Sequence, residues 1–308
     1  MEFNHISVML EETISALNIK PDGIYVDGTA GGAGHSKVIA SSLKNGQLIA
    51  LDRDPDAIRV ATERLNGLPA RVIKSNFKDM DKVLDELNIE KVDGILLDLG
   101  VSSFQLDEAT RGFSFHKEAP LDMRMSKEGF SAFDLVNKAS QRELSDIIFD
   151  YGEDKFARRI SERIVAAREN KEIQTTTELA EIIASAVPAA ARRDGHPARK
   201  TFQALRIAVN DELGSLKEVL DKAFDRLNVN GVLAIITFHS LEDRIVKQKF
   251  KEFCTGCTCP KDFPVCVCGN TPRGELTSRK AIEASKEELE INPRSRSAKL
   301  RAITKIKD

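Results

Sequence analysis

Apolar runs and amphipathic segments alternate over the first hundred residues of the chain. Short, continuously apolar runs predict strands at residues 23–28, 47–52, 70–75 and 92–100. The segments between them repeat apolar residues at helical spacing and predict helices at residues 35–46, with Ser36 as the cap, and at residues 55–67 and 80–89. Apolar strands that alternate with helices are typical of a parallel sheet covered on both faces.

The alternation stops after the fourth strand. Residues 101–125 mix glycine, proline and charged residues without periodicity and predict a long loop. Loops of this length in a compact domain are usually functional. Residues 131–188 then follow a helical pattern. Capping-box spacing marks two helix starts there, Ser140 with Glu143 and Thr175 with Glu178.

The sheet pattern resumes after this helical stretch. A helix is expected over residues 201–227, a strongly apolar strand at 231–238, a helix at 241–253 and two edge strands at 278–285 and 299–306. We therefore predict an α/β fold with a seven-stranded sheet and an inserted all-helical domain. The expected parts are residues 1–105, residues 106–200 for the loop and the insertion, and residues 201–308 with a cysteine-rich excursion at 254–268.

Composition restricts the class of protein. The chain has 308 residues, of which 41% are hydrophobic and 31% charged, enough for a globular protein with a sizeable core. The net charge of −2 predicts no general affinity for nucleic acid, so any basic surface is local. No apolar run reaches the roughly 18 residues of a membrane span, and the acidic first residues do not resemble a signal peptide. We expect a cytoplasmic protein without a membrane partner.

The sequence "YVDGTAGGAGHS" at residues 25–36 places a glycine-rich turn after the first strand. Its glycines, at positions 28, 31, 32 and 34, do not have the G-x-G-x-x-G spacing of a dinucleotide site. They also do not form the G-x-x-x-x-G-K-[ST] motif of a phosphate loop. The turn is therefore suited to a ligand that lies against the backbone and has no phosphate to bind.

Three aspartates, Asp27, Asp52 and Asp98, stand at the ends of predicted strands. Ligands of open α/β sheets bind at the carboxyl ends of strands, and an acid after the second strand commonly accepts hydrogen bonds from ribose hydroxyls. Any single acid of this kind is as readily a helix cap. Together with the glycine turn, the three favour S-adenosylmethionine over NAD. Phe77, just after the third strand, either borders the adenine or belongs to the core.

Eight ordered blocks of the sequence resemble one family, the bacterial 16S ribosomal RNA cytosine-N4 methyltransferases. They are "HISVMLEE", "DGTAGGAGHS", "ALDRDP", "DGILLDLGVSSFQLD", "RGFSF", "PLDMRM", "TFQALRIAVN" and "ITFHSLEDRIVK". The resemblance continues to "NPRSRSAKLRA" near the C-terminus and so covers nearly the whole chain. It implies a class I S-adenosylmethionine-dependent methyltransferase sheet and methylation of N4 of one cytidine in the decoding region. The implied partner is 16S rRNA or the small ribosomal subunit, and not DNA.

The resemblance also implies a set of cofactor residues. These are Ala33, Gly34 and His35 in the glycine turn, Asp52 at the ribose, Phe77 beside the adenine, and Asp98 with Gln105. Where many amino-methyltransferases have an Asp/Asn/Ser-Pro-Pro-aromatic motif, this chain has Asp98-Leu99-Gly100-Val101. The aromatic residue that stacks on the target base therefore stays open among Phe104, Phe113 and Phe115.

Chemistry assigns Asp98 as the catalytic candidate. The N4 lone pair of cytosine is delocalised into the ring, so an acceptor must hold the amine while the nitrogen pyramidalises. A strong general base is unnecessary because the methylated product readily loses its proton. The target base must leave its stack to reach such a pocket.

Cationic residues for RNA phosphates gather in one short segment and one loop. The segment "ARRDGHPARK" contains Arg192, Arg193, Arg199 and Lys200, and the loop contains His116 and Arg124. Solvated surface charge is the alternative for the segment, and ion pairs that hold the loop are the alternative for the other two.

All five cysteines lie within "CTGCTCPKDFPVCVC", residues 254–268. In a reducing compartment this spacing indicates a zinc site or a set of free thiols. The candidate zinc ligands are Cys254, Cys257, Cys266 and Cys268, with Cys259 able to replace one of them.

Two other functions compete with a methyltransferase. An NAD-dependent oxidoreductase is disfavoured because the glycines of this chain do not have the spacing of a dinucleotide site. A non-catalytic RNA-binding or zinc-organised scaffold would leave the three strand-end acids unexplained.

Overall fold

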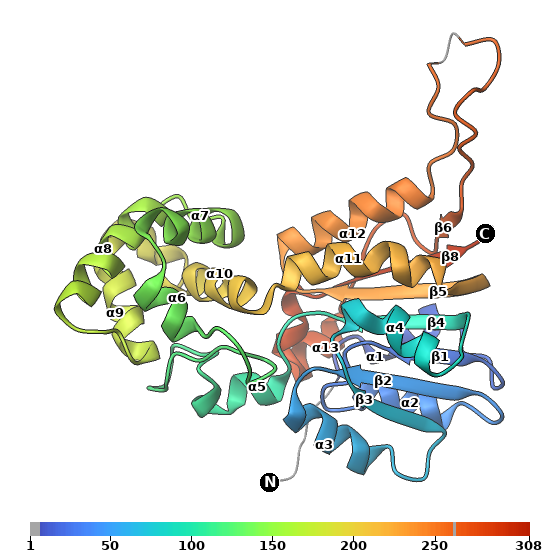
Figure 1. The fold of residues 1–308 in the computed structure, drawn as a ribbon, viewed down its shortest axis with the longest axis horizontal. Coiled ribbons are helices and arrows are strands. Elements are labelled where there is room, and N and C mark those ends of the chain that lie inside the picture. Colours follow the sequence, from blue (N-terminus) through green and yellow to red (C-terminus); the bar gives the residue numbers. More distant parts are fainter. Residues whose placement is uncertain (1–6, 261–262) are drawn as a thin grey trace. The chain divides into compact units, whose positions relative to one another are not determined.

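The computed structural model describes residues 7–260 and 263–308, without the side chains of Ser103, Arg193 and Asp194. It divides into two compact units (Figure 1). The sheet unit comprises residues 1–100 and 214–308, and the helical unit comprises residues 101–213. These compact units meet after residues 100 and 213, and the boundaries after residues 105 and 200 stay a prediction from the sequence.

Within the described residues the sheet has eight strands rather than the expected seven, in the order β3-β2-β1-β4-β5-β8-β6, with β7 paired to β8. The additional strand is β6, whose three residues are too few to show a pattern. β1 to β5 run parallel, and β8 is antiparallel to β5. The bounds are β1 Ile24–Asp27, β2 Gln47–Asp52, β3 Ala70–Lys74, β4 Val92–Asp98, β5 Leu227–Thr237, β6 Gly274–Leu276, β7 Ile282–Glu283 and β8 Lys299–Lys305.

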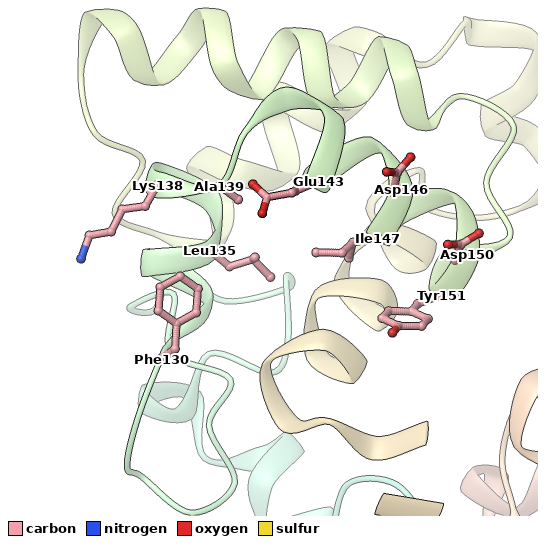
Figure 2. Close-up of a pocket in the computed structure, with 9 residues that line it drawn as sticks. All are labelled: Phe130, Leu135, Lys138, Ala139, Glu143, Asp146, Ile147, Asp150 and Tyr151. Atoms are coloured by element: carbon pink, nitrogen blue, oxygen red, sulfur yellow. The ribbon is translucent and has the colours of Figure 1, made fainter. Parts of the chain in front are cut away.

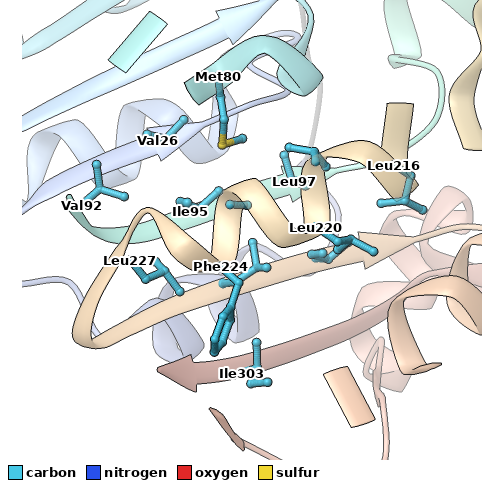
Figure 3. Packing of buried hydrophobic residues seen from close by; sticks show 14 of the residues in the cluster. Val26, Met80, Val92, Ile95, Leu97, Leu216, Leu220, Phe224, Leu227 and Ile303 are labelled. Atoms are coloured by element: carbon cyan, nitrogen blue, oxygen red, sulfur yellow. The ribbon is translucent and has the colours of Figure 1, made fainter. Parts of the chain in front are cut away.

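Alternate residues of the central strands enter two separate cores, because successive side chains of a strand point to opposite faces. In β2, Ile49 and Leu51 join the core in Figure 3, whereas Leu48 and Ala50 join the core on the other face. Both faces are buried, so these strands read as continuous apolar runs.

Helices cover both faces of the sheet. Residues of α4 (Met80–Glu86), α11 (Glu212–Asp225) and α12 (Ser240–Phe253) join the first core, and residues of α1 (Leu10–Leu17), α2 (Gly34–Ser41) and α3 (Pro55–Arg64) join the second. In α11 the buried residues Leu216, Val219, Leu220, Ala223 and Phe224 follow helical spacing. Figure 3 labels Leu216, Leu220 and Phe224 of this set. The remaining elements of the unit are α13 (Lys286–Ile291) and the 3₁₀ turns η1 (Phe77–Asp79) and η4 (Pro293–Ser297).

The helical unit has its own core, built from residues between Phe113 and Leu205. Its helices are α5 Ser103–Asp107, α6 Ala132–Lys138, α7 Gln141–Gly152, α8 Ala157–Asn170, α9 Thr176–Ala186 and α10 Ala198–Asn210, with 3₁₀ turns η2 Ala109–Arg111 and η3 Ala189–Asp194. The capping boxes expected at Ser140 and Thr175 are confirmed. The predicted loop contains α5 and η2 and is therefore partly helical.

The long helix expected over residues 201–227 is two helices. α10 ends at Asn210, and Asp211 adopts a left-handed conformation with φ 47° before α11 begins. The apolar period continues across this break, which is why the pattern did not reveal it. Among the residues that the structure describes, no helix is long and apolar enough to cross a membrane.

Candidate active site

Asp27, Asp52 and Asp98 end three neighbouring strands of the sheet unit. Because β2, β1 and β4 are adjacent and parallel, their carboxyl ends lie at one edge of the sheet. The crossover order changes direction between β1 and β4, and ligands of open α/β sheets bind at such a switch point. The structure thus brings the three predicted acids to one edge.

Asp27 is buried and fully engaged inside the protein. Its Oδ2 accepts a hydrogen bond of 2.5 Å from the Ser36 hydroxyl, and its Oδ1 accepts one of 3.0 Å from the Thr29 amide. Burial raises the pKa of Asp27 above its usual value, although these hydrogen bonds partly oppose the rise. Asp27 therefore positions the turn. Ser36 lies within α2 and binds Asp27; the N-cap of α2 is Ala33, which corrects the predicted cap.

Thr29 connects the glycine turn to β4, a role that sequence reasoning missed. Its hydroxyl oxygen accepts a hydrogen bond of 2.6 Å from the Asp98 amide, and the same hydroxyl lies 3.4 Å from Asp27 Oδ1. A threonine among glycines gives no signal of this kind in a sequence. The contact fixes the backbone that carries the catalytic candidate.

The glycine turn owes its shape to close backbone contacts. Gly31 and Ala33 have positive φ angles of 48° and 59°. A Cβ atom on Gly34 would collide with the Ser7 hydroxyl, and one on Gly28 would lie 2.5 Å from Leu97 Cδ2. A side chain at position 28 or 34 would therefore force Leu97 or Ser7 to shift, which accounts for two of the glycines found in the sequence.

Asp52 joins the glycine turn to the start of α3. Its Oδ2 accepts a hydrogen bond of 2.8 Å from the Gly31 amide, and its Oδ1 accepts one of 2.8 Å from the Asp54 amide. Burial raises the pKa of Asp52 to about 6, against the lowering effect of both amides. Asparagine cannot replace it without loss, because both carboxylate oxygens face N–H donors.

His35 and Asp98 face each other across the turn. His35 Nε2 lies 3.0 Å from the Val8 carbonyl, which can only accept, so Nε2 carries the hydrogen. The other ring nitrogen, Nδ1, lies 3.8 Å from Asp98 Oδ2. His35 is buried, and its ring connects residue 8 to α2.

Asp98 has a buried atom without a partner. Its Oδ1 is shielded from solvent and has no hydrogen bond among the described residues, although the side chain as a whole is 25% exposed. Burial, followed by the negative charges of Asp27 and Glu242, raises the pKa of Asp98 well above its usual range. An unpaired buried acceptor is costly, which is typical of an atom whose partner is a ligand.

Phe77 and Gln105 occupy different units. Phe77 begins η1, packs against the first core and has its Cβ beside Gly28. Gln105 belongs to the helical unit, where its side chain accepts a hydrogen bond of 3.0 Å from the Ser102 amide in the capping box of α5. The sheet unit therefore gathers every predicted cofactor residue except Gln105.

The residues at this edge suit S-adenosylmethionine. Three carboxyl groups disfavour a pyrophosphate and favour a ligand with cationic groups. The Asp52 carboxylate is an acceptor for hydroxyl donors, and the tight glycine turn leaves backbone rather than side chains beside the ligand. The same features argue against the NAD-dependent alternative.

The predicted RNA-contact residues all belong to the helical unit. Arg192 donates hydrogen bonds to the carbonyls of Val187 and Ala184 at the end of α9, and Arg124 donates to the Asp122 carboxylate and to the Gly129 carbonyl. His116 and Arg199 are exposed, and exposed Lys200 donates to the Glu153 carbonyl. The Arg193 side chain lies outside the described residues.

An aromatic cluster centres on Phe115, which also contacts His116. The ring of Phe115 stacks on His196 at a centroid distance of 4.5 Å and meets Phe202 edge-on at 5.3 Å. Phe113 is buried in the core of the helical unit. Of the three open aromatic candidates, Phe113 is therefore the least available to a base.

A hollow of about 520 Å³ lies in the helical unit, away from every predicted site residue (Figure 2). Its lining is Phe130, Leu135, Lys138, Ala139, Glu143, Asp146, Ile147, Asp150 and Tyr151. Carboxylates of Glu143, Asp146 and Asp150 line one side and repel phosphate, so this hollow is no part of the RNA-contact set.

Four of the five cysteines lie close together, and the fifth lies apart from them. Cys254 caps the C-terminus of α12 and packs against the first core, whereas the ligand atoms of Cys257, Cys259, Cys266 and Cys268 lie within 4.8 Å of one another. Cys259 thus takes the place in this group that was expected for Cys254.

The Ser7–Gly34 contact gives a direct test of the turn. We expect Gly34→Ala to lower the free energy of unfolding by about 1–3 kcal/mol, because the new methyl group collides with Ser7. Gly32→Ala is the matched control, since a Cβ there would meet nothing nearer than Arg64 at 3.6 Å. The double variant Ser7→Gly/Gly34→Ala should regain most of the lost free energy of unfolding, as measured by urea unfolding. Equal losses for Gly34→Ala and Gly32→Ala would contradict this packing.

Comparison with known proteins places the chain in a family. The model of the MraW methylase family matches residues 2–306. The chain is 57% identical to "Ribosomal RNA small subunit methyltransferase H" of Clostridium botulinum (strain Loch Maree), covering 99% of this chain and 100% of that protein. It is also 57% identical to the protein of the same name from Lachnospira eligens, covering 99% of each. A solved structure of an rRNA methylase from Streptococcus thermophilus aligns with a TM-score of 0.41 at 12% identity, covering 97% of this chain and 92% of that one. The chain belongs to the MraW methylase family and is an S-adenosylmethionine-dependent methyltransferase.

Proposed function

We propose that this methyltransferase methylates the exocyclic N4 atom of one cytidine in the decoding region of 16S rRNA, as naked RNA or within the small subunit. Its close relatives carry the name ribosomal RNA small subunit methyltransferase H, and the sequence motifs resemble the cytosine-N4 family. The observation that carries the proposal is the Asp98 carboxyl group at the switch point of the sheet, which is 25% exposed and has one oxygen without a hydrogen bond among the described residues.

Asp98 is suited to hold an amine. When bound, S-adenosylmethionine supplies an electrophilic methyl group on a positively charged sulfur. An ionised Asp98 accepts a hydrogen bond from the N4 amino group and so turns the nitrogen lone pair out of the ring plane. The Thr29 hydroxyl holds the Asp98 backbone, so this acceptor is positioned before the substrate arrives.

The location of the cysteines supports an amine over a ring carbon as the methyl acceptor. Methylation of a pyrimidine ring carbon calls for a nucleophile that adds to the ring, typically a thiolate. α12 begins after the carboxyl end of β5 and has 14 residues, so Cys254 at its far end lies about 20 Å along the helix from that edge. The other four cysteines follow it in the chain.

The proposed RNA contacts come from the helical unit. Arg199 and Lys200 are exposed at the start of α10 and are suited to phosphates. Arg192 and Arg124 already bind backbone carbonyls, so their proposed contribution is to hold the surface that RNA meets. We retain His116 and Arg193 in this set, and Phe104 or Phe115 as the stacking residue. The target cytidine is expected to be flipped out or single-stranded.

The raised pKa of Asp52 predicts pH-dependent cofactor binding. As the pH falls through about 6, Asp52 becomes protonated and loses an acceptor for the ribose. Affinity for S-adenosylhomocysteine should therefore weaken by up to about tenfold per pH unit below that point. The folded protein binds this proton more tightly than the unfolded chain, so Asp52 itself favours the fold at acid pH. Calorimetric titration at about pH 5 to 8 checks this, and an affinity that stays constant, or rises in acid, would contradict the role of Asp52.

Asp98→Asn tests the proposed chemistry. Asparagine lacks the charge of the acceptor, so we expect the turnover number to fall about 10²- to 10³-fold while affinity for S-adenosylhomocysteine changes little. Asp98 must lose its proton to act as the acceptor, so the turnover number of the wild type should rise with pH. The turnover number of Asp98→Asn should not show this rise. The assay measures transfer of labelled methyl to unmethylated 16S rRNA and to small subunits assembled with it.

Asp22→Asn is the control for this assay. Asp22 is exposed and precedes β1, at the opposite edge of the sheet, where it bonds only to Asn45 among the described residues. The control should retain wild-type turnover. Equal losses of turnover and cofactor affinity in Asp98→Asn would mark Asp98 as a binding residue alone.

A further inference from the structure

The segment between α12 and β6 has no helix or strand in its described residues, yet its cysteines gather at one point. Figure 1 shows the segment as an extension beyond the end of α12. None of its described residues after Phe253 and before Gly274 is buried. Hydrophobic burial therefore does not hold this segment together, and another interaction must.

The four sulfur atoms have the spacing of a metal centre. Cys257 Sγ lies 3.3 Å from Cys266 Sγ and 3.7 Å from Cys268 Sγ, and Cys266 Sγ lies 3.6 Å from Cys268 Sγ. Cys259 Sγ is within 4.8 Å of all three. Four thiolates around one zinc ion, each about 2.3 Å from the metal, are about 3.8 Å apart at the corners of a tetrahedron. A disulfide would require about 2.05 Å, so these sulfurs are close but unbonded.

Backbone amides point at the same sulfur atoms. The amides of Val267 and Cys268 each donate to Cys259 Sγ at 3.3 Å. The amides of Thr258 and Asn270 donate to Cys268 Sγ at 3.3 and 3.5 Å. Such N–H donors stabilise thiolates, the form in which cysteine binds a metal, and orient them as outer contacts of the site.

A side-chain contact also joins the two arms of the segment beside the sulfur atoms. The Asn270 side-chain amide donates to the carbonyls of Thr255 and Gly256, at 3.2 and 2.9 Å. This contact closes the base of the loop on the side of α12. It brings the C-x-C pair of residues 257 and 259 against the C-x-C pair of residues 266 and 268.

We propose that Cys257, Cys259, Cys266 and Cys268 form a structural zinc site that joins residues 257–259 to residues 266–268. All four positions of the tetrahedron are filled by protein, so the ion has no open position for substrate and takes no part in methyl transfer. Binding converts four thiols and one Zn²⁺ into a tetrathiolate centre and releases their protons, so occupancy falls in acid. Cys254 is excluded from the site because it packs against the core at the end of α12.

Metal analysis of the full chain tests this site. Protein purified under reducing conditions, or reconstituted with zinc chloride and desalted, should contain one zinc per chain. Cys259→Ser and Cys268→Ser should lose it, whereas Cys254→Ser, the matched control, should keep it. Cobalt(II) in place of zinc should give the visible absorption bands of tetrahedral thiolate coordination in the control and not in the two variants.

Alkylation provides a second measurement that does not depend on the stability of a variant. In the zinc-loaded wild type the four proposed ligand thiols should resist iodoacetamide, and a chelator should make all four reactive. The proposal would be overturned if the protein stayed zinc-free after reconstitution and its four thiols remained reactive. Disulfides among these four cysteines under reducing conditions would also overturn it, as would loss of zinc in Cys254→Ser. None of these readouts uses methyl transfer, so failure here and failure of the proposed function remain distinct.

Discussion

The buried carboxylate of Asp27 is the interaction on which the arrangement of the site depends. It accepts hydrogen bonds from the Ser36 hydroxyl and the Thr29 amide, and Thr29 in turn accepts the amide of Asp98. A buried charge without such partners would cost several kcal/mol. With them, one side chain connects β1, the glycine turn, the first turn of α2 and the end of β4. The catalytic candidate therefore has a fixed place before any ligand binds.

A second carboxylate extends this connection to β2. Asp52 binds the Gly31 amide on one side and the Asp54 amide on the other. Both oxygens are used by the protein, yet the side chain stays partly accessible at the edge of the sheet. The acids that looked alike in the sequence thus differ in kind. Asp27 and Asp52 both hold the turn through hydrogen bonds, whereas Asp98 has one oxygen without a hydrogen bond among the described residues.

Much of the sheet unit could be predicted from the sequence, because strands buried on both faces leave continuous apolar runs. The same property placed Asp52 and Asp98 at the ends of β2 and β4. The sequence could not reveal features that arise between distant segments or without periodicity. β6 is three residues long, the break at Asp211 lies within an unbroken apolar period, and Thr29 acts through a single hydroxyl. The choice between Cys254 and Cys259 depends on where α12 ends, which spacing alone does not give.

The central claim is that this site delivers methyl to an exocyclic amine held by Asp98. The most direct measurement identifies the product: enzyme, labelled S-adenosylmethionine and small subunits that lack the modification are incubated, and the RNA is digested to nucleosides for mass spectrometry. If Asp98 holds an exocyclic amine, the label should appear in N4-methylcytidine alone, at a single position in the decoding region. Label on a pyrimidine ring carbon or on a ribose oxygen would contradict it.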